Sequence, residues 1–425
     1  MIRLLVTGDL HIGRRPTRLP DERALCASCA AMWDDIVGEA LAREVDAVLL
    51  SGDVIDSENR FYEAIGALQR GLERLAGQQI PTYAVAGNHD HDVLPQIADT
   101  LPDTAFQLLG RGGRWEAVTV EREGQPLFRL LGWSFPAQYV TNDPLGELPA
   151  LPSSTVPTIG LLHCELDTPG SRYAPTSLRA LQDAALDCWV IGHVHKPLHV
   201  AAAGRVTVLN PGSPQAMDPG EPGAHGPWLI ETTSGGALHC EQLAISRVRY
   251  ERIDIDLSDV DDEVGFRRTV IGSLHEGLED IAAQPTAPAF VLWRVRLIGR
   301  TTIHGEVAPW ADELVQEYEH SLAKTTARVE HVDIDTRPAI DLEELARAHD
   351  PPGTLARLLL DLEADCQSPQ IDTLVAQAAA AIEDVGRNHA FSDVADVRAE
   401  AGHAQQLLQR QGWLLLDRLL AQKES

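Results

Sequence analysis

Five short polar motifs, each placed directly after a run of apolar residues, constrain this sequence more than any other feature. They are Asp9-Leu10-His11, Gly52-Asp53, Gly87-Asn88-His89-Asp90, His163 and Gly192-His193-Val194-His195. The apolar runs before them are short, so each is predicted to be a β-strand. Because loops at the carboxyl ends of strands can converge without disturbing the core, we expect the five motifs to meet at one place.

The side chains of these motifs form a chemically consistent set of donors. Two carboxylates, one amide and four imidazoles offer nitrogen or oxygen donors, from Asp9, His11, Asp53, Asn88, His163, His193 and His195. Such a set suits Mn²⁺, Fe²⁺ or Zn²⁺ and is poorly suited to copper(I). Seven protein donors are too many for one ion and suit two, with one carboxylate shared between them.

Each motif alone has an ordinary structural explanation. Asp9-Leu10-His11 can be a capped turn, Gly52-Asp53 a tight turn, and His163 a core histidine. Those explanations would have to coincide five times in the same order, so the ordered set favours a metal site.

The order of predicted elements divides the chain of 425 residues into three regions. Residues 1–246 alternate short strands with helical patterns, which is typical of a layered α+β domain. Residues 247–340 predict a β-α-β-α-β unit with strands at 249–257, 290–300 and 328–335 and helices at 263–281 and 309–323. Residues 341–425 read as a helical tail, and one core could not contain all three regions.

Composition excludes several classes of protein. The formal net charge of −28 argues against a basic nucleic-acid binder held by bulk charge, so a polyanion would be met locally by a few arginines or by metal ions. Among the cysteines only Cys26 and Cys29 have a metal-like spacing, and a zinc ribbon needs a second pair. We place both on one amphipathic helix that spans residues 25–41. The sequence shows no signal-peptide core or membrane span, which predicts a soluble, cytoplasmic protein.

With its motifs in this order, the chain resembles the calcineurin-like metallophosphoesterase superfamily, a fold of two packed β-sheets flanked by helices around a dinuclear metal site. The resemblance covers about the first 230 residues. It implies one ion held by Asp9, His11, Asp53 and His195 and a second held by Asp53, Asn88, His163 and His193, with Asp53 as the bridge. Two metal ions held in this way activate water and stabilise the transition state of phosphoester hydrolysis, so no protein nucleophile is needed.

The resemblance also assigns roles to two residues beside the ligands. His89 would stabilise or protonate the leaving alkoxide, and Asp56 would orient His89 through a hydrogen bond. The alternative for Asp56 is a loop cap. Protein phosphatases of the superfamily carry Gly-Asn-His-Glu, whereas this motif ends in Asp90, which argues against a protein substrate.

Several further features look like bacterial DNA-repair exonucleases of the SbcD type, in particular the YhaO-like branch. These features are the Asp9-Leu10-His11-Ile12-Gly13 opening, the Gly52 to Asp56 loop, the Asn210-Pro211-Gly212-Ser213 turn, the small α/β unit and the leucine-rich tail. The resemblance implies a Mn²⁺-dependent DNA exonuclease that also cuts single strands internally. It further implies a cap that holds DNA, a tail that docks on an SbcC-like coiled-coil ATPase, and a homodimer.

In a chain this acidic, contact with DNA would need basic residues near the metal site. Arg14, Arg15 and Arg18 follow the first ligand motif and are candidates for phosphate binding, although they can equally be ordinary surface arginines. Two rival functions also remain, which are a phosphodiesterase for a small nucleotide ester and a catalytically silent scaffold.

Overall fold

The computed structural model describes residues 2–58, 62–150, 154–184, 186–201, 206–232, 238–363, 369–386 and 401–424. These residues form two compact units. The first comprises Met1–Leu257, Asp262–Ile298 and Glu306–Asp335, and the second comprises Ser258–Asp261, Gly299–Gly305 and Thr336–Ser425. The division into three domains at residues 246 and 340 stays a prediction.

The first sheet of the larger unit has six strands, three of which end at the polar motifs. Their order is β12 (Leu238–Gln242), β11 (Trp228–Thr232), β1 (Arg3–Thr7), β2 (Ala47–Leu50), β3 (Thr82–Ala84) and β4 (Phe106–Leu108). Strands β1 to β4 run parallel, whereas β11 and β12 are antiparallel. The parallel register places the ends of β1, β2 and β3 at one edge.

The second sheet supplies the remaining two motifs. Its order is β5 (Glu116–Arg122), β6 (Gln125–Trp133), β7 (Thr158–His163), β8 (Cys188–Gly192), β10 (Thr207–Asn210) and β9 (Leu198–Val200). It packs on the first sheet through an apolar cluster that contains Leu4, Leu49, Leu130, Leu161 and Val190. The expected two-sheet metallophosphoesterase sandwich is therefore confirmed.

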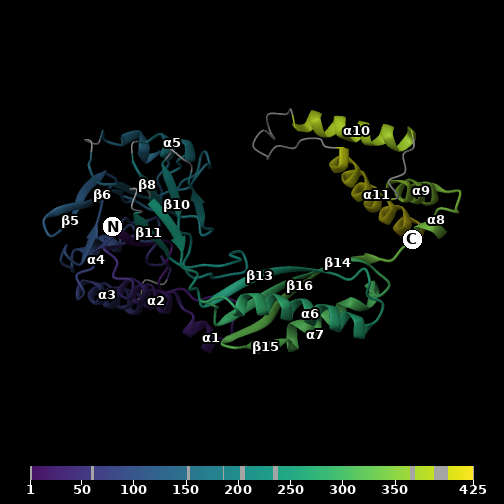
Figure 1. Ribbon diagram of the computed structural model, residues 1–425, viewed down its shortest axis with the longest axis horizontal. Coiled ribbons are helices and arrows are strands. Elements are labelled where there is room, and N and C mark those ends of the chain that lie inside the picture. Colours follow the sequence, from purple (N-terminus) through teal and green to yellow (C-terminus); the bar gives the residue numbers. More distant parts are fainter. Residues whose placement is uncertain are drawn as a thin grey trace. The chain divides into compact units, whose positions relative to one another are not determined.

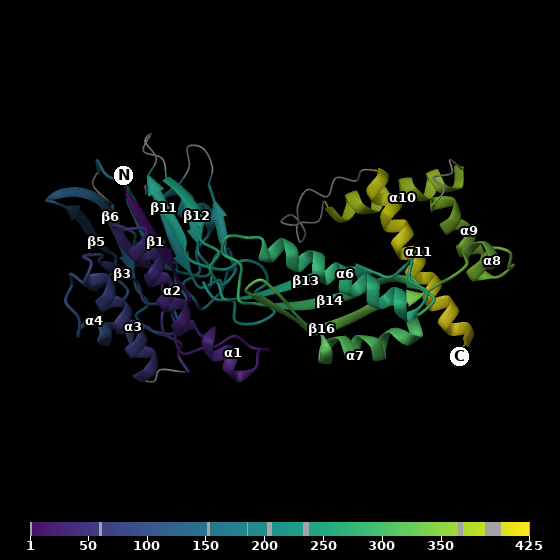
Figure 2. The ribbon, with the colours of Figure 1, turned by 60° about the horizontal axis from the view of Figure 1, so that its bottom comes forward.

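Helices cover the outer faces of the sandwich. They are α2 (Cys29–Ala42), α3 (Tyr62–Ala76), α4 (Leu94–Ala98), α5 (Leu178–Asp183) and a 3-10 turn at Pro144–Glu147. The short helix α1 (Asp21–Cys26) instead contacts a further, four-stranded sheet, where Arg23 pairs with Glu319. Helices α2 and α3 lie side by side in both views (Figures 1 and 2). The single helix expected over residues 25–41 is wrong, because the chain leaves α1 at Ala27 and Ser28 caps α2 by accepting a hydrogen bond from the amide of Ala31.

A four-stranded sheet follows, and most of it belongs to the same unit. Its order is β13 (Val248–Asp256), β14 (Phe290–Thr301), β16 (Thr325–Pro338) and β15 (Glu319–Leu322). Helix α6 (Glu263–Ala282) lies along this sheet (Figures 1 and 2), and α7 (Val307–Glu317) follows a 3-10 turn at His304–Glu306. The helix predicted at 309–323 is too long, since it ends at Glu317 and the next residues form the edge strand β15.

The smaller unit is mainly helical, as the sequence predicts. It contains α8 (Leu342–Leu345), α9 (Pro351–Glu363), α10 (Pro369–Gly386) and α11 (Ala401–Glu424). Helices α9 and α11 pack through Leu359 and Leu416, and Arg300 anchors α11 by a double contact to Asp417. In the described part of the chain, no helix has the length and apolar character needed to cross a bilayer.

Two glycines of α3 provide a matched test of core packing. A Cβ atom on Gly71 would lie 2.1 Å from Nε1 of the fully buried Trp33, whereas one on Gly66 would meet only the flexible end of Arg70 at 3.3 Å. We expect Gly71→Ala to destabilise the protein by ~1–3 kcal/mol through overpacking. Gly66→Ala should stabilise it by ~0.5–1 kcal/mol, because alanine is the better helix former. Thermal unfolding of both variants measures the difference, and equal shifts would contradict this account.

Candidate metal centre

The five motifs converge where the two sheets meet. Asp9 and His11 follow β1, Asp53 follows β2, Asn88 follows β3, and the second sheet contributes His163 at the end of β7 with His193 and His195 after β8. All seven side chains are buried or partly buried. The structure therefore brings together every residue that the sequence predicts as a ligand, although metal binding itself stays a prediction.

Four of these residues have a left-handed backbone, which is uncommon for any residue other than glycine. Their φ angles are 48° at Asp9, 44° at His11, 49° at Asp53 and 99° at His193. Hydrogen bonds between loops maintain this conformation, because the amides of Asp9 and His11 donate to the carbonyls of Gly52 and Asp53 at 3.0 Å. Strain of this kind clusters at functional sites.

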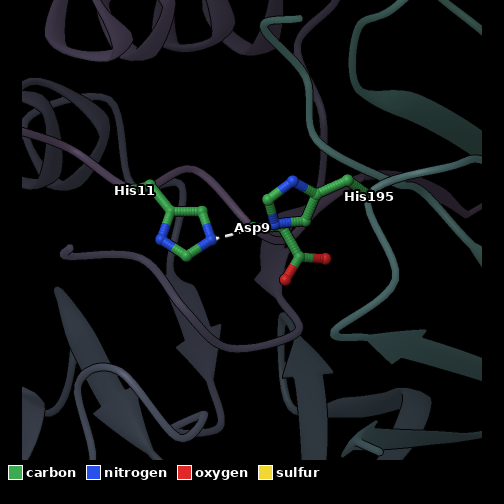
Figure 3. A group of neighbouring side chains, drawn as sticks. All are labelled: Asp9, His11 and His195. Carbon is green, nitrogen blue, oxygen red and sulfur yellow. Dashed lines mark hydrogen bonds between the residues drawn. The ribbon is translucent and has the colours of Figure 1, made fainter. Parts of the chain in front are cut away.

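Six of the candidate ligands form two groups of three. Within each group, the donor atoms lie within 4.8 Å of one another. One group is Asp9, His11 and His195, and the other is Asp53, His163 and His193. In the first group the Nε2 atoms of His11 and His195 face each other at 3.1 Å beside the Asp9 carboxylate (Figure 3). Next to the second group, Oδ1 of Asn88 lies 3.1 Å from Nε2 of His163 and 3.2 Å from Nδ1 of His193.

Asp53 lies between the two groups. Its Oδ2 atom is 3.3 Å from Nε2 of His163 and 4.0 Å from Nε2 of His11, while its Oδ1 accepts the amide of His89 at 2.8 Å. Burial alone would raise the pKa of Asp53, but the surrounding histidines, led by His163, lower it below its usual range. Asp53 is thus an anionic group shared by both clusters, which is the geometry expected of a bridging ligand.

In three of these histidines, the ring nitrogen that points away from the centre, here called the outer nitrogen, faces a protein acceptor. Nδ1 of His195 lies 2.6 Å from Glu221, Nδ1 of His163 donates to the carbonyl of Ser51 at 3.0 Å, and Nε2 of His193 lies 3.5 Å from Glu165. Such partners fix the tautomer and ring orientation of metal-binding histidines.

Sequence reasoning missed Glu165 and Glu221. Neither belongs to a motif, and only their place in the loops after β7 and β10 could have pointed to them.

Two further groups hold the loops in place. The side chain of Asn210 donates to the carbonyls of Val194 and Lys196 at 2.6 and 3.1 Å, so the Asn210 turn fixes the loop that carries His193 and His195. The buried Asp90 accepts the amides of Val54 and Gly87 at 2.6 and 2.8 Å, which ties the second motif to the third. Burial raises the pKa of the Asp90 carboxyl.

His89 lies beside the first group, with its ring centroid 4.7 Å from that of His11. Its Nδ1 is 2.9 Å from Oγ of Ser57 and 3.6 Å from Oδ1 of Asp56. The interaction with Asp56 raises the pKa of His89 despite its partial burial. Asp56 lies equally far from Nδ1 of His11, so it serves two imidazoles, and Ser57 is a closer partner of His89 that the sequence did not indicate.

The three candidate phosphate-binding arginines differ in their surroundings. Arg14 is half-buried in the loop after His11, and Arg15 is exposed. The exposed Arg18 lies 3.7 Å from the carboxylate of Glu330 on β16. Their part in substrate binding stays a prediction.

Residues 2–197 match the calcineurin-like phosphoesterase family, and residues 250–337 match the middle domain of metallophosphoesterase YhaO. Residues 2–197 belong to the calcineurin-like phosphoesterase family. Members of this family bind two divalent metals, and the two ligand groups of this phosphoesterase fit such a pair, because their donors are imidazoles, carboxylates and an amide oxygen on either side of Asp53.

Three relatives illustrate the similarity. The uncharacterized metallophosphoesterase YhaO of Bacillus subtilis is 28% identical over 53% of this chain and 54% of its own length. The DNA double-strand break repair protein Mre11 of Methanosarcina mazei is 27% identical over 33% of this chain and 24% of its own. A dimetal phosphatase from Danio rerio aligns with 57% of this chain and 98% of its own at 12% identity, with a TM-score of 0.35. The matched region thus spans about half of YhaO and a quarter of Mre11.

The contact between Glu221 and His195 can be tested directly. We expect Glu221→Ala to weaken the binding of divalent cations by about 10- to 100-fold, because His195 loses the acceptor that orients its ring. Glu221→Gln should retain more affinity, since its amide oxygen can still accept. Calorimetric titration with Mn²⁺ measures the change, with Glu73→Ala on the exposed face of α3 as the control. Unchanged affinity in Glu221→Ala would show that the contact does not support a ligand.

Proposed function

We propose that this phosphoesterase is a Mn²⁺-dependent phosphodiesterase that hydrolyses DNA from an end and also cuts single strands internally. The observation that carries the proposal is the buried carboxylate of Asp53, which lies within 4.0 Å of histidines from both groups. The similarity to a protein named for DNA double-strand break repair supports DNA as the substrate. Residues 1–246 would carry out hydrolysis and residues 247–340 would cap the site.

In this proposal the ligands divide as the family resemblance implies. Asp9, His11 and His195 would hold one divalent cation, Asn88, His163 and His193 would hold the other, and both would share Asp53. When bound, the two cations supply Lewis acidity that activates water and neutralises the charge of the phosphate. The chain contributes orientation, because the acceptors Glu221 and Ser51 hold the outer nitrogens of His195 and His163 and turn the inner nitrogens toward the centre.

His89 is the group placed to assist the leaving oxygen. Its ring is partly exposed next to His11, and Asp56 favours its protonated form. An imidazolium in this position can donate a proton to the alkoxide that leaves the phosphorus. Ser57 and Asp56 would then act as positioning residues that fix the Nδ1 side of the ring.

His89→Ala should lower the turnover of DNA by at least about 100-fold, the scale typical of general acid–base groups. The content of bound metal should stay unchanged, because His89 is not among the proposed ligands. Initial rates and elemental analysis of the same preparation provide both numbers. His199→Ala on the surface strand β9 is the control. Loss of metal from His89→Ala would mean that this histidine is a ligand.

The substrate itself is tested by digestion of labelled DNA. With Mn²⁺ present, we expect the protein to shorten duplex DNA and to cut single strands, and we expect Asp53→Ala to abolish both activities. Hydrolysis of a small nucleotide ester without any action on DNA would favour the first rival function. Absence of metal-stimulated turnover on every phosphodiester would favour a silent scaffold.

We further propose that the tail, residues 341–425, docks on an SbcC-like coiled-coil ATPase. Helix α11 presents Leu407, Leu414 and Leu415, with exposed fractions of 37%, 41% and 49%, at a spacing of seven and eight residues. This spacing puts the three leucines on one face of the helix, where they can serve as anchors for a partner helix.

The paired substitutions Leu414→Glu and Leu415→Glu should abolish binding of the ATPase while the nuclease activity on single strands persists. Two charges on this face cannot be desolvated at an apolar interface. Gln406→Glu adds a charge at an exposed polar position of the same helix and serves as the control. Co-sedimentation with the purified ATPase measures binding, and retention of the doubly substituted protein would exclude docking through this face.

A further inference from the structure

A row of aromatic rings runs from the candidate metal centre toward the surface. The ring of Tyr173 lies over the candidate ligand His193, with centroids 4.7 Å apart and planes tilted by 35°. Tyr139 follows at 5.9 Å from Tyr173, and the guanidinium of Arg172 lies 4.6 Å from the centroid of Tyr139. The row therefore begins at a proposed ligand and ends at a tyrosine that is 46% exposed.

Two loops of the second sheet hold these rings in position. The loop after β6 carries Tyr139 and the loop after β7 carries Tyr173, and a bridge pairs Val140 with Tyr173. The amide of Val140 donates to the carbonyl of Arg172 at 2.8 Å, and the amide of Ala174 donates back to Val140 at 2.7 Å. These bonds fix the spacing between the two tyrosines.

Contacts within the loop after β7 fix the distance of Tyr173 from the candidate metal centre. Glu165 donates its amide to the carbonyl of Tyr173 at 2.8 Å, and its carboxylate accepts the hydroxyl of Ser171 at 2.7 Å. The same carboxylate faces Nε2 of His193. One residue thus supports both the candidate ligand and the tyrosine that lies on it.

The chemistry of this row fits an unpaired nucleobase. Aromatic side chains bind single-stranded nucleic acid by stacking on any base, and arginine adds a planar cation for a base or a phosphate. Bases of a duplex are already stacked and paired, so only an unpaired base can use such a surface. The guanidinium of Arg172 contacts the ring of Tyr139, whereas Arg294 and Arg296 of the four-stranded sheet are paired with Asp333 and Asp254.

We propose that Tyr139, Arg172 and Tyr173 form a stacking platform that holds an unpaired base of the substrate next to the metal centre. The inference rests on the proposed function and deepens it, because it makes single-stranded DNA the form that the site recognises. Tyr139 provides the exposed ring, Tyr173 supports it against His193, and Arg172 provides the cation.

The test compares two substrates that share a backbone and differ in their bases. One is a labelled single-stranded oligothymidylate, and the other carries abasic residues throughout its central segment. For the wild-type protein with Mn²⁺, we expect kcat/KM on the oligothymidylate to be about 10-fold higher, the order of one base–aromatic contact. Tyr139→Leu should remove this preference, and Tyr139→Phe should retain it. Arg179→Ala, an exposed arginine on α5, is the matched control for Arg172→Ala.

The outcomes separate the platform from the proposed function. Equal cleavage of both substrates by the wild-type protein would overturn the platform while the nuclease assignment stands. A preference that persists in Tyr139→Leu and in Arg172→Ala would also overturn it. No cleavage of any DNA by the metal-loaded protein would overturn the proposed function together with this inference. Loss of the preference in Tyr139→Leu and its retention in Tyr139→Phe would support the platform.

Discussion

The whole arrangement depends on the burial of one carboxylate between two sheets. Asp53 leaves the first sheet, yet its Oδ2 lies against His163 of the second, and its Oδ1 accepts the amide of His89. This position of Asp53 requires the backbone at Gly87 and at Gly192 to lie very close to the loop that follows β2. A Cβ atom on Gly87 would lie 2.2 Å from Oδ1 of Asp53, and one on Gly192 would lie 2.4 Å from the carbonyl of Ser51. Any larger residue at either position would separate the loops that form the centre.

The same constraint explains the strained backbone around the site. A left-handed conformation at a residue such as Asp9 or His11 costs ~1–3 kcal/mol, and the buried bonds between neighbouring loops must offset that cost. Asp90 also supports these loops, because its carboxylate accepts backbone amides from both the loop of Asp53 and the loop of Asn88. The protein itself therefore holds the donor side chains in place. They would need little rearrangement to bind a cation.

Charge imposes a second constraint on how an acidic chain can handle DNA. In the four-stranded sheet, Arg294 and Arg296 are paired with acids of the same sheet, and Arg18 faces Glu330. A polyanion would have to displace these acids before it could use the cations. If the proposed function is right, affinity for nucleic acid would come from the candidate metal centre and from contacts that do not depend on net charge, and aromatic stacking is such a contact.

The amino-acid sequence by itself determined the central strands and the candidate ligands, because these strands are continuous apolar runs and the polar residues that follow them are unusual in type and order. The sandwich of two sheets was implied by the family resemblance that these motifs carry. Among the described residues, strands β4, β5, β9, β12 and β15 lie at sheet edges, where a strand is short or mostly exposed and its apolar pattern is correspondingly weak. Only the tertiary structure supplied Glu165, Glu221 and Ser57 as partners of histidines, and the aromatic row beside them. These contacts join loops that are distant in the chain, so their side chains acquire partners only when the two sheets pack together.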